Sequence, residues 1–127
     1  MAQPMTQTAG PSGGGARNQP MQACIDECAR CAAACGACGV ACLELSSAEM
    51  VDCAKACLDC QQICLLAAAF MQRSSRLHTA LCRACAEVCD ACARACDRHA
   101  AMHEHCRRCA EACRACADEC RRMAGSA

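Results

Sequence analysis

Polar and apolar positions along this chain repeat at the spacing of an α-helix, and cysteine occupies many of the apolar ones. Within four blocks, the interval between successive cysteines alternates between three and four residues. Because these intervals bracket the 3.6-residue turn, all thiols of a block lie on one face of a helix. Each block is a heptad seam with cysteine where a coiled coil would carry leucine. The pattern predicts four helices whose thiol faces meet in one core.

The 20 cysteines of the chain all belong to these seams. The first seam contains Cys24, Cys28, Cys31, Cys35, Cys38 and Cys42, and the second contains Cys53, Cys57, Cys60 and Cys64. The third contains Cys82, Cys85, Cys89, Cys92 and Cys96, and the fourth Cys106, Cys109, Cys113, Cys116 and Cys120.

Capping residues suggest where the helices begin. Pro20 suits a first helical turn, where its missing N–H costs nothing. Ser46 and Glu49 have the spacing of a capping box that starts the second helix, and Ser74 or Ser75 can cap the third. We expect helices over residues 20–45, 47–73, 75–100 and 103–123, after a disordered arm of residues 1–19 that is rich in Gly, Pro, Gln and Ser.

The third and fourth seams are joined by residues 97–105, which contain neither Gly nor Pro. One continuous rod of about 48 residues, roughly 70 Å long, is therefore an alternative. However, the cysteine phase changes between Cys96 and Cys106, and a rod would leave thiol seams unburied. We expect a hairpin at residues 100–103. Short connections then give an all-α fold, an antiparallel up-down-up-down four-helix bundle with a cysteine-lined core.

Composition limits the class of protein. A chain of 127 residues is one domain by length, and its 13 basic and 13 acidic residues leave no net charge to recruit nucleic acid. Phe70 is the only aromatic residue, so the bases of a nucleic acid have no stacking platform. The first residues lack a secretory h-region or twin arginine, and we see no run of roughly 20 apolar residues. We therefore expect a cytoplasmic protein that binds neither nucleic acid nor membrane.

Reduced cytosolic thiols more often bind metal than form disulfides. Neighbouring cysteines within one helix have Cβ atoms about 5–6 Å apart, whereas a disulfide needs a Cβ–Cβ distance of about 3.5–4.5 Å. Disulfides between helices therefore remain the alternative to metal binding. A single buried cysteine can act as a small hydrophobe. A core of cysteine and alanine, however, buries far less apolar area than leucine and isoleucine would. The 20 thiols are therefore interpreted as metal ligands.

Thiolates suit Cu(I), Zn(II) and iron–sulfur clusters. The chain lacks the successive C-x₂-C steps of cluster motifs, and its C-x₂-C pairs lie inside helices rather than in zinc knuckles. Cu(I) accepts two or three sulfurs, which a C-x₃-C pair such as Cys24 and Cys28 can begin to supply. Because buried thiolates must be neutralised, we expect roughly 10 to 20 Cu(I) per chain. That capacity indicates a store and no enzyme.

The run of C-x₃-C and C-x₂-C pairs over residues 24–120 resembles the copper storage proteins, which are cysteine-lined four-helix bundles that fill with Cu(I). The resemblance is to the cytosolic branch of that family, and it implies a homo-oligomer, typically a homotetramer. A copper chaperone or efflux pump is the expected exchange partner. Two alternatives stay open. They are a metallothionein-like scavenger of zinc or cadmium, and a thiol redox protein that would need a low-pKa cysteine such as Cys24 or Cys82 at a helix start.

Methionine and histidine continue the seams to both ends of the predicted bundle. One end should hold Met50, His99, Met102 and His103, with His105 nearby, and the other Met21, Met71, His78 and Met123. Thioether and neutral imidazole bind Cu(I) without first losing a proton. We predict that copper enters at the end that contains His99.

Overall fold

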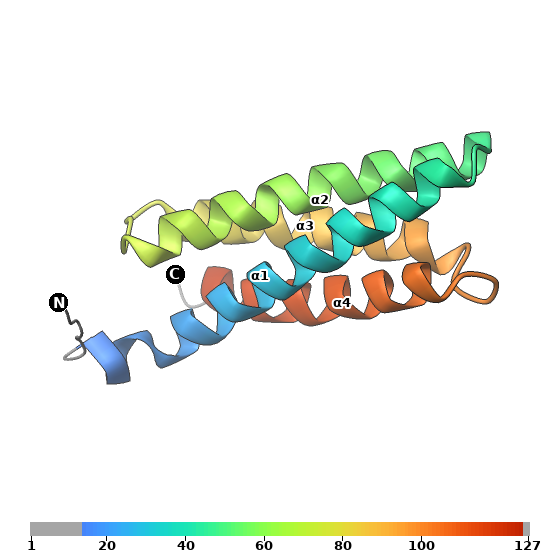
Figure 1. Ribbon diagram of the computed structural model, residues 1–127. Coiled ribbons are helices and arrows are strands. Elements are labelled where there is room, and N and C mark those ends of the chain that lie inside the picture. Colours follow the sequence, from blue (N-terminus) through green and yellow to red (C-terminus); the bar gives the residue numbers. More distant parts are fainter. Residues whose placement is uncertain (1–13, 126–127) are drawn as a thin grey trace, which may run out of the picture.

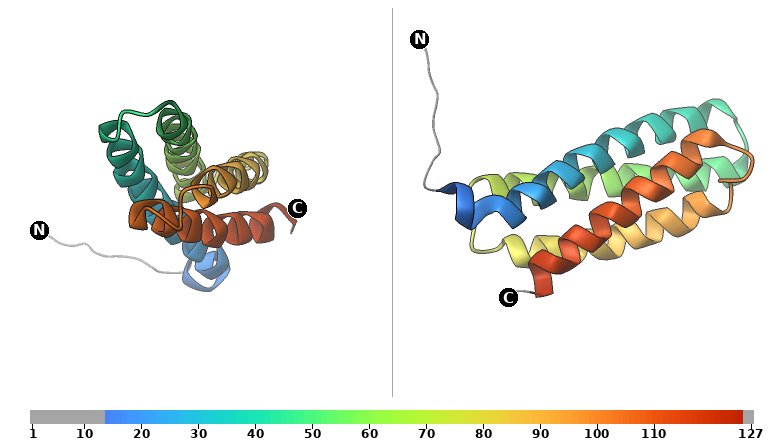
Figure 2. Two further views of the ribbon diagram at one scale, coloured as in Figure 1. Left: turned by 90° about the vertical axis from the view of Figure 1, so that its right-hand side faces the viewer. Right: turned by 90° about the horizontal axis from the view of Figure 1, so that it is seen from below.

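The computed structural model describes residues 14–125, which form four α-helices joined by short connections (Figure 1). These are α1 (Gly14–Glu44), α2 (Ala48–Gln72), α3 (His78–Asp97) and α4 (Glu104–Gly125). The helix α1 packs against α2 and α4, and α3 packs against the same two helices. The views in Figure 2 show the four helices around a common axis. The predicted cysteine-lined four-helix bundle is confirmed.

The connections divide the bundle into two different ends (Figure 1). The α1–α2 and α3–α4 connections lie at one end, which we call the loop end. The α2–α3 connection lies at the other with the start of α1 and the end of α4, and we call this the termini end. In the α3–α4 connection, the N–H groups of Met102 and His103 donate to the carbonyl of His99, at 3.1 and 2.9 Å. This turn separates α3 from α4, and the continuous rod does not form.

The first helix begins earlier than the sequence suggested. α1 starts at Gly14, so Pro20 lies inside the helix rather than in its first turn. Pro20 is exposed, so water can satisfy the carbonyl that a proline leaves without its helical partner. The predicted disordered arm of residues 1–19 is therefore wrong for residues 14–19, and residues 1–13 lie outside the described part of the chain.

The predicted capping residues are displaced at two helices. Ser47, and not Ser46, caps α2 by accepting the N–H of Met50 at 3.2 Å. Ser46 instead has a left-handed backbone with φ of 57°, and its N–H donates to the carbonyl of Leu43 as α1 ends. At α3 the N-cap is Leu77, which makes no side-chain cap. The Ser75 hydroxyl accepts the N–H of Leu77 at 3.1 Å, so it supports the preceding turn.

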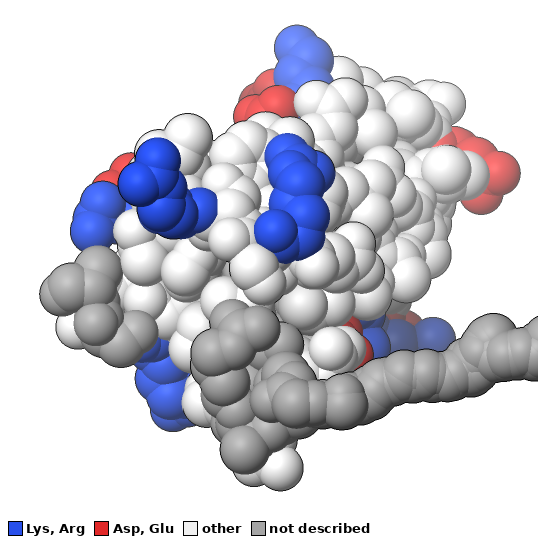
Figure 3. Space-filling view, turned by 90° about the vertical axis from the view of Figure 1, so that its left-hand side faces the viewer, with Lys and Arg blue, Asp and Glu red and all other residues white. Residues whose placement is uncertain are grey.

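Charged side chains are unevenly distributed over the surface. Seven of the eight ion pairs among the described residues lie on α3 and α4, whereas α2 forms none. Basic side chains stand out at the termini end (Figure 3). By length and composition α2 could cross a membrane, contrary to the sequence expectation, although core helices of soluble proteins pass the same test. Its thiol face belongs to the core of the bundle.

A glycine lets α1 and α2 approach closely. The side-chain amide of Gln61 donates to the carbonyl of Ala32 at 3.1 Å. A Cβ at Gly36 would lie only 2.5 Å from that amide nitrogen. One helical turn away, a Cβ at Gly39 would make an ordinary contact of 3.6 Å with Cys57 Cβ. Gly36 is therefore required by the hydrogen bond between the two helices.

We predict that Gly36→Ala gives a free energy of unfolding of the reduced apoprotein about 1–2 kcal/mol lower than Gly39→Ala does, because both changes gain the helix propensity of alanine but only Gly36→Ala displaces the Gln61 amide from its acceptor. Urea denaturation followed by circular dichroism measures this change. Gly39→Ala is the matched control and should be neutral or stabilising, since alanine favours a helix. In a Gln61→Ala background the penalty of Gly36→Ala should disappear. A penalty that persists there would contradict the proposed clash.

Candidate metal-binding core

The four helices place all of the cysteine side chains in the interior. Each of the 20 is buried, and none forms a disulfide. Their sulfur atoms form a continuous network from helix to helix, with contacts such as Cys60–Cys89 at 3.6 Å and Cys31–Cys113 at 3.7 Å. The rest of the buried core is alanine, methionine and Ile25, without a buried polar or charged residue among those described. The interior is thus a dry tube lined with sulfur.

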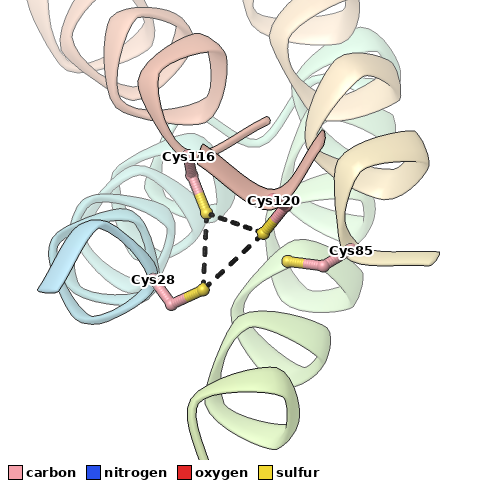
Figure 4. A group of neighbouring side chains, drawn as sticks. All are labelled: Cys28, Cys85, Cys116 and Cys120. Atoms are coloured by element: carbon pink, nitrogen blue, oxygen red, sulfur yellow. Dashed lines mark hydrogen bonds between the residues drawn. The ribbon is translucent and has the colours of Figure 1, made fainter. Parts of the chain in front are cut away.

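Sulfur atoms from different helices come together in groups of four. In one group Cys28 Sγ lies 3.7 Å from Cys116 Sγ and 3.9 Å from Cys120 Sγ, and Cys85 completes the group (Figure 4). A metal ion equidistant from three sulfurs at these separations would lie about 2.2 Å from each, close to the bond length of roughly 2.3 Å that zinc makes to thiolate. The apo spacing therefore already suits a closed-shell metal ion bound by thiolates.

Several cysteines belong to more than one group. Cys31 occurs in two groups, and so do Cys35, Cys113 and Cys116. Four further groups are Cys31–Cys35–Cys60–Cys113, Cys31–Cys64–Cys89–Cys116, Cys35–Cys92–Cys109–Cys113 and Cys38–Cys53–Cys57–Cys96, each with its ligand atoms within 4.8 Å of one another. Because the groups share ligands, the core offers a connected array of sulfur rather than separate tetrahedral sites.

Burial keeps the outermost thiols protonated. Desolvation, supported by the neighbouring Cys38, raises the pKa of the Cys42 thiol from 9.0 to about 11. Desolvation and Cys38 likewise raise the pKa of Cys106. At neutral pH these thiols are therefore uncharged, and a metal ion can bind them as thiolates only if protons leave.

The predicted entry residues lie together at the loop end but at different depths. Met50 is buried, whereas His99 and Met102 line a surface cleft of about 520 Å³ with Glu49, Asp52 and Arg98. The Met102 side chain is 83% exposed. The ring of His103 lies 5.4 Å from that of His105.

His105 is the histidine that contacts the thiols. Its Nδ1 lies 3.4 Å from Cys38 Sγ and 3.5 Å from Cys106 Sγ. Sequence reasoning placed it only nearby, because it directly precedes Cys106 rather than standing three or four residues from it. The adjacency to a seam cysteine at the start of a helix was the signal that could have identified it.

Thioethers close the termini end of the tube. Met71 and Met123 are buried, and Met21 packs partly buried against the core. The thiol of Cys82 donates to Met71 Sδ at 3.7 Å. His78 Nδ1 lies 2.8 Å from the carbonyl oxygen of Ser75. This imidazole is therefore engaged with the backbone, unlike His105 at the loop end.

Comparison with known proteins identifies the family. The family model for copper storage protein matches residues 17–125. The chain belongs to the copper storage protein family. A cytosolic copper storage protein from Streptomyces lividans, solved with five coppers, is 44% identical over 88% of this chain and 98% of its own, with a TM-score of 0.78. The apo form of copper storage protein 3 from Bacillus subtilis is 40% identical, covering 81% and 97% of the two chains at a TM-score of 0.74.

A second structure of the Streptomyces lividans copper storage protein was loaded with 10 copper equivalents. It is 42% identical to this chain over 92% of each, with a TM-score of 0.79. No curated protein sequence matches the chain.

We predict that the reduced apoprotein loses stability as pH rises above about 9, the ordinary thiol pKa. Between that value and the raised native pKa the unfolded chain releases protons that the native state keeps, so alkaline pH favours unfolding. Below pH 9 this contribution is fully present. Urea denaturation at pH 7 and pH 10 under reducing conditions measures the loss.

Replacing Cys42 and Cys106 by alanine should reduce the alkaline loss, because two thiols with a raised pKa are removed. An unfolding free energy that is unchanged between pH 7 and pH 10 in the parent protein would contradict the raised thiol pKa.

Proposed function

We propose that this protein stores and buffers Cu(I) in the cytosol by binding many ions through its core cysteines, and that it catalyses no reaction. The observation that carries the proposal is the array of 20 buried thiols, disulfide-free and arranged in overlapping groups. The copper-loaded Streptomyces lividans relatives support copper as the metal. Each Cu⁺ that replaces a thiol proton leaves the dry interior uncharged, which explains how a closed core can fill.

The number of metal ions separates storage from its alternatives. With one to two thiolates per ion, 20 cysteines bind roughly 10 to 20 Cu(I). Tetrahedral zinc sites that share no ligand would bind about 5 ions. A thiol redox protein would use one C-x₂-C pair and would bind few metal ions or none. The overlap of the groups favours Cu(I), because ions with two or three ligands can share the array.

Copper would enter at the loop end. Met102 and His99 line a surface cleft there, and the half-buried His105 contacts the thiols of Cys38 and Cys106. An incoming ion held by neutral nitrogen and sulfur donors can wait while a thiol loses its proton. At the opposite end Met71 and Met123 are buried, and the His78 imidazole is engaged with the carbonyl of Ser75, so we favour the loop end.

Exchange of copper with other molecules needs donor side chains that link the core to the surface, because none of the thiols reaches the surface. We propose a copper chaperone or an efflux pump as the partner, and a homotetramer as the assembly. The resemblance to the family supports the assembly, and the buried core supports the need for a protein or small-molecule donor.

Anaerobic titration of the reduced protein with Cu(I) against a chromophoric chelator should saturate at roughly 10 to 20 ions per chain. Replacing Cys31, Cys35, Cys60 and Cys113 by serine removes one central group and should lower the capacity by about two to four ions, at one to two thiolates per ion. A parallel zinc titration is the control and should stop near 5 ions. Saturation of the parent protein at one or two copper ions would rule out storage.

Loading from a chelated Cu(I) donor should slow by about tenfold in a variant with His99→Ala, His103→Ala, Met50→Leu and Met102→Leu, because the mouth loses neutral ligands. The final capacity should fall by only one or two ions. Stopped-flow absorbance of the chelator measures the rate.

Two further variants separate the mouth from the other end. His105→Ala alone should slow the transfer into the core, since its ring contacts both Cys38 and Cys106. Met21→Leu with His78→Ala is the matched control at the termini end and should load at the parent rate. Slower loading in this control and an unchanged rate in the loop-end variants would place the entrance at the termini end.

A further inference from the structure

Within the core, some sulfur atoms form closed triangles in which each thiol contacts the other two. Three of these triangles have no cysteine in common. They are Cys28–Cys116–Cys120, Cys31–Cys60–Cys113 and Cys64–Cys85–Cys89. The first has Sγ–Sγ distances of 3.7, 3.9 and 4.0 Å, drawn as dashed lines in Figure 4. The second and the third each have distances of 3.7, 3.7 and 3.8 Å. All three triangles can therefore hold an ion at the same time.

Further closed triangles overlap with these three. They are Cys31–Cys35–Cys113, Cys35–Cys109–Cys113 and Cys60–Cys64–Cys89. The first two contain Cys113, which belongs to the second of the separate triangles, and the last contains Cys64 and Cys89 of the third. An ion that needs three thiolates to itself cannot share them with a neighbouring ion. These triangles together therefore hold at most three such ions.

The charge balance of the core decides which ions fit a triangle. The core has no buried polar or charged residue among those described, so a bound ion and its thiolates have to be neutral together. A Cu⁺ ion balances one thiolate. A Zn²⁺ ion in a group of four thiolates leaves two negative charges without a partner. Three thiolates are balanced by a trivalent ion, and trivalent arsenic is a thiophilic one that takes three ligands in a pyramid.

We propose that each separate triangle binds one arsenic(III) through its three sulfur atoms, so that the core sequesters arsenious acid as well as Cu(I). Arsenious acid, As(OH)₃, is uncharged at neutral pH and enters the core without a counter-ion. In the reaction As(OH)₃ + 3 Cys-SH → As(S-Cys)₃ + 3 H₂O, three As–O and three S–H bonds break while three As–S and three O–H bonds form. No electron is transferred, and the product is neutral. This activity goes beyond copper storage and does not depend on it.

The proton balance separates the two cargoes. A Cu⁺ ion replaces thiol protons, which have to leave the protein. Arsenious acid instead carries the thiol protons away in water. Loading a weakly buffered solution of the reduced protein with arsenious acid should therefore leave its pH unchanged, whereas loading with Cu(I) should lower it. A proton released for each thiol that arsenic binds would contradict the neutral product.

Anaerobic titration of the reduced full-length protein with arsenious acid tests the sites. The ultraviolet absorbance of the arsenic–thiolate bond and the arsenic content after gel filtration give the stoichiometry, which should be about three per chain at one ion per triangle. Cys28→Ser, Cys89→Ser and Cys113→Ser each open one triangle together with every triangle above that overlaps it. Each single variant should lose one arsenic, and the triple variant should lose all tight binding.

The matched control removes the same number of thiols from outside these triangles. It combines Cys42→Ser, Cys53→Ser and Cys96→Ser, and it should keep the arsenic stoichiometry of the parent protein. Copper capacity should fall by the same amount in the two triple variants, because each has lost three thiolates. The copper titration thus reports on storage separately from the arsenic sites.

Equal loss of arsenic from the two triple variants would overturn the proposal, because binding would then follow the number of thiols and not the triangles. If the triple variant with opened triangles loses its helical circular dichroism, the three single variants decide the question. A parent protein that binds many Cu(I) ions but no arsenic would refute the arsenic sites alone. One that binds arsenic but only one or two Cu(I) ions would refute storage and leave the arsenic sites intact.

Discussion

The rest of the structure depends on holding 20 sulfur ligands in a buried interior that has no polar side chain among the described residues. Such a core is stable while its thiols are neutral, and desolvation favours the neutral form, as the raised pKa of the Cys42 thiol shows. It is also tolerable when Cu⁺ replaces the protons, since charge is again balanced. A core of thiolates without bound metal would be strongly destabilised, because the buried negative charges would be desolvated and would repel one another. Metal entry and proton loss are therefore coupled at every step, and the bundle can exist in both the empty and the filled form.

Cysteine and alanine are poor material for a hydrophobic core, because they bury little apolar area per residue. Backbone hydrogen bonding and close approach of the helices must compensate. Gly36 and Gln61 provide both between α1 and α2. Because Gly36 has no Cβ, the side-chain amide of Gln61 has room to donate to the carbonyl of Ala32 in α1. Copper adds to this modest stability, because an ion that binds only the native state contributes its binding free energy to folding.

The periodicity of the cysteines alone predicted the fold. Intervals that alternate between three and four residues place the thiols on one face of a helix, and four such faces have to be buried together. The boundaries were less predictable. Ser46 and Ser47 are both good caps, and only the left-handed turn at Ser46 decides between them. The proposed entry residues were predicted by extending the seams, which identifies positions three or four residues from a cysteine. His105 is adjacent to a cysteine, and its contact with Cys38 comes from the packing of α4 against α1.

The two ends of the tube differ in their donors, and this difference is the basis of the proposed direction of filling. At the termini end the thiol of Cys82 contacts the buried thioether of Met71, and the partly exposed His78 is engaged with the carbonyl of Ser75. At the loop end the imidazole of His105 touches two thiols, and His99 and Met102 supply further soft donors in a surface cleft. The group of Cys38, Cys53, Cys57 and Cys96 reaches the next group through Cys57, whose Sγ lies 3.8 Å from Cys109 Sγ. Deeper in the core, successive groups share ligands such as Cys31 and Cys35. On the proposed route, an ion would therefore exchange one sulfur at a time and keep a ligand throughout.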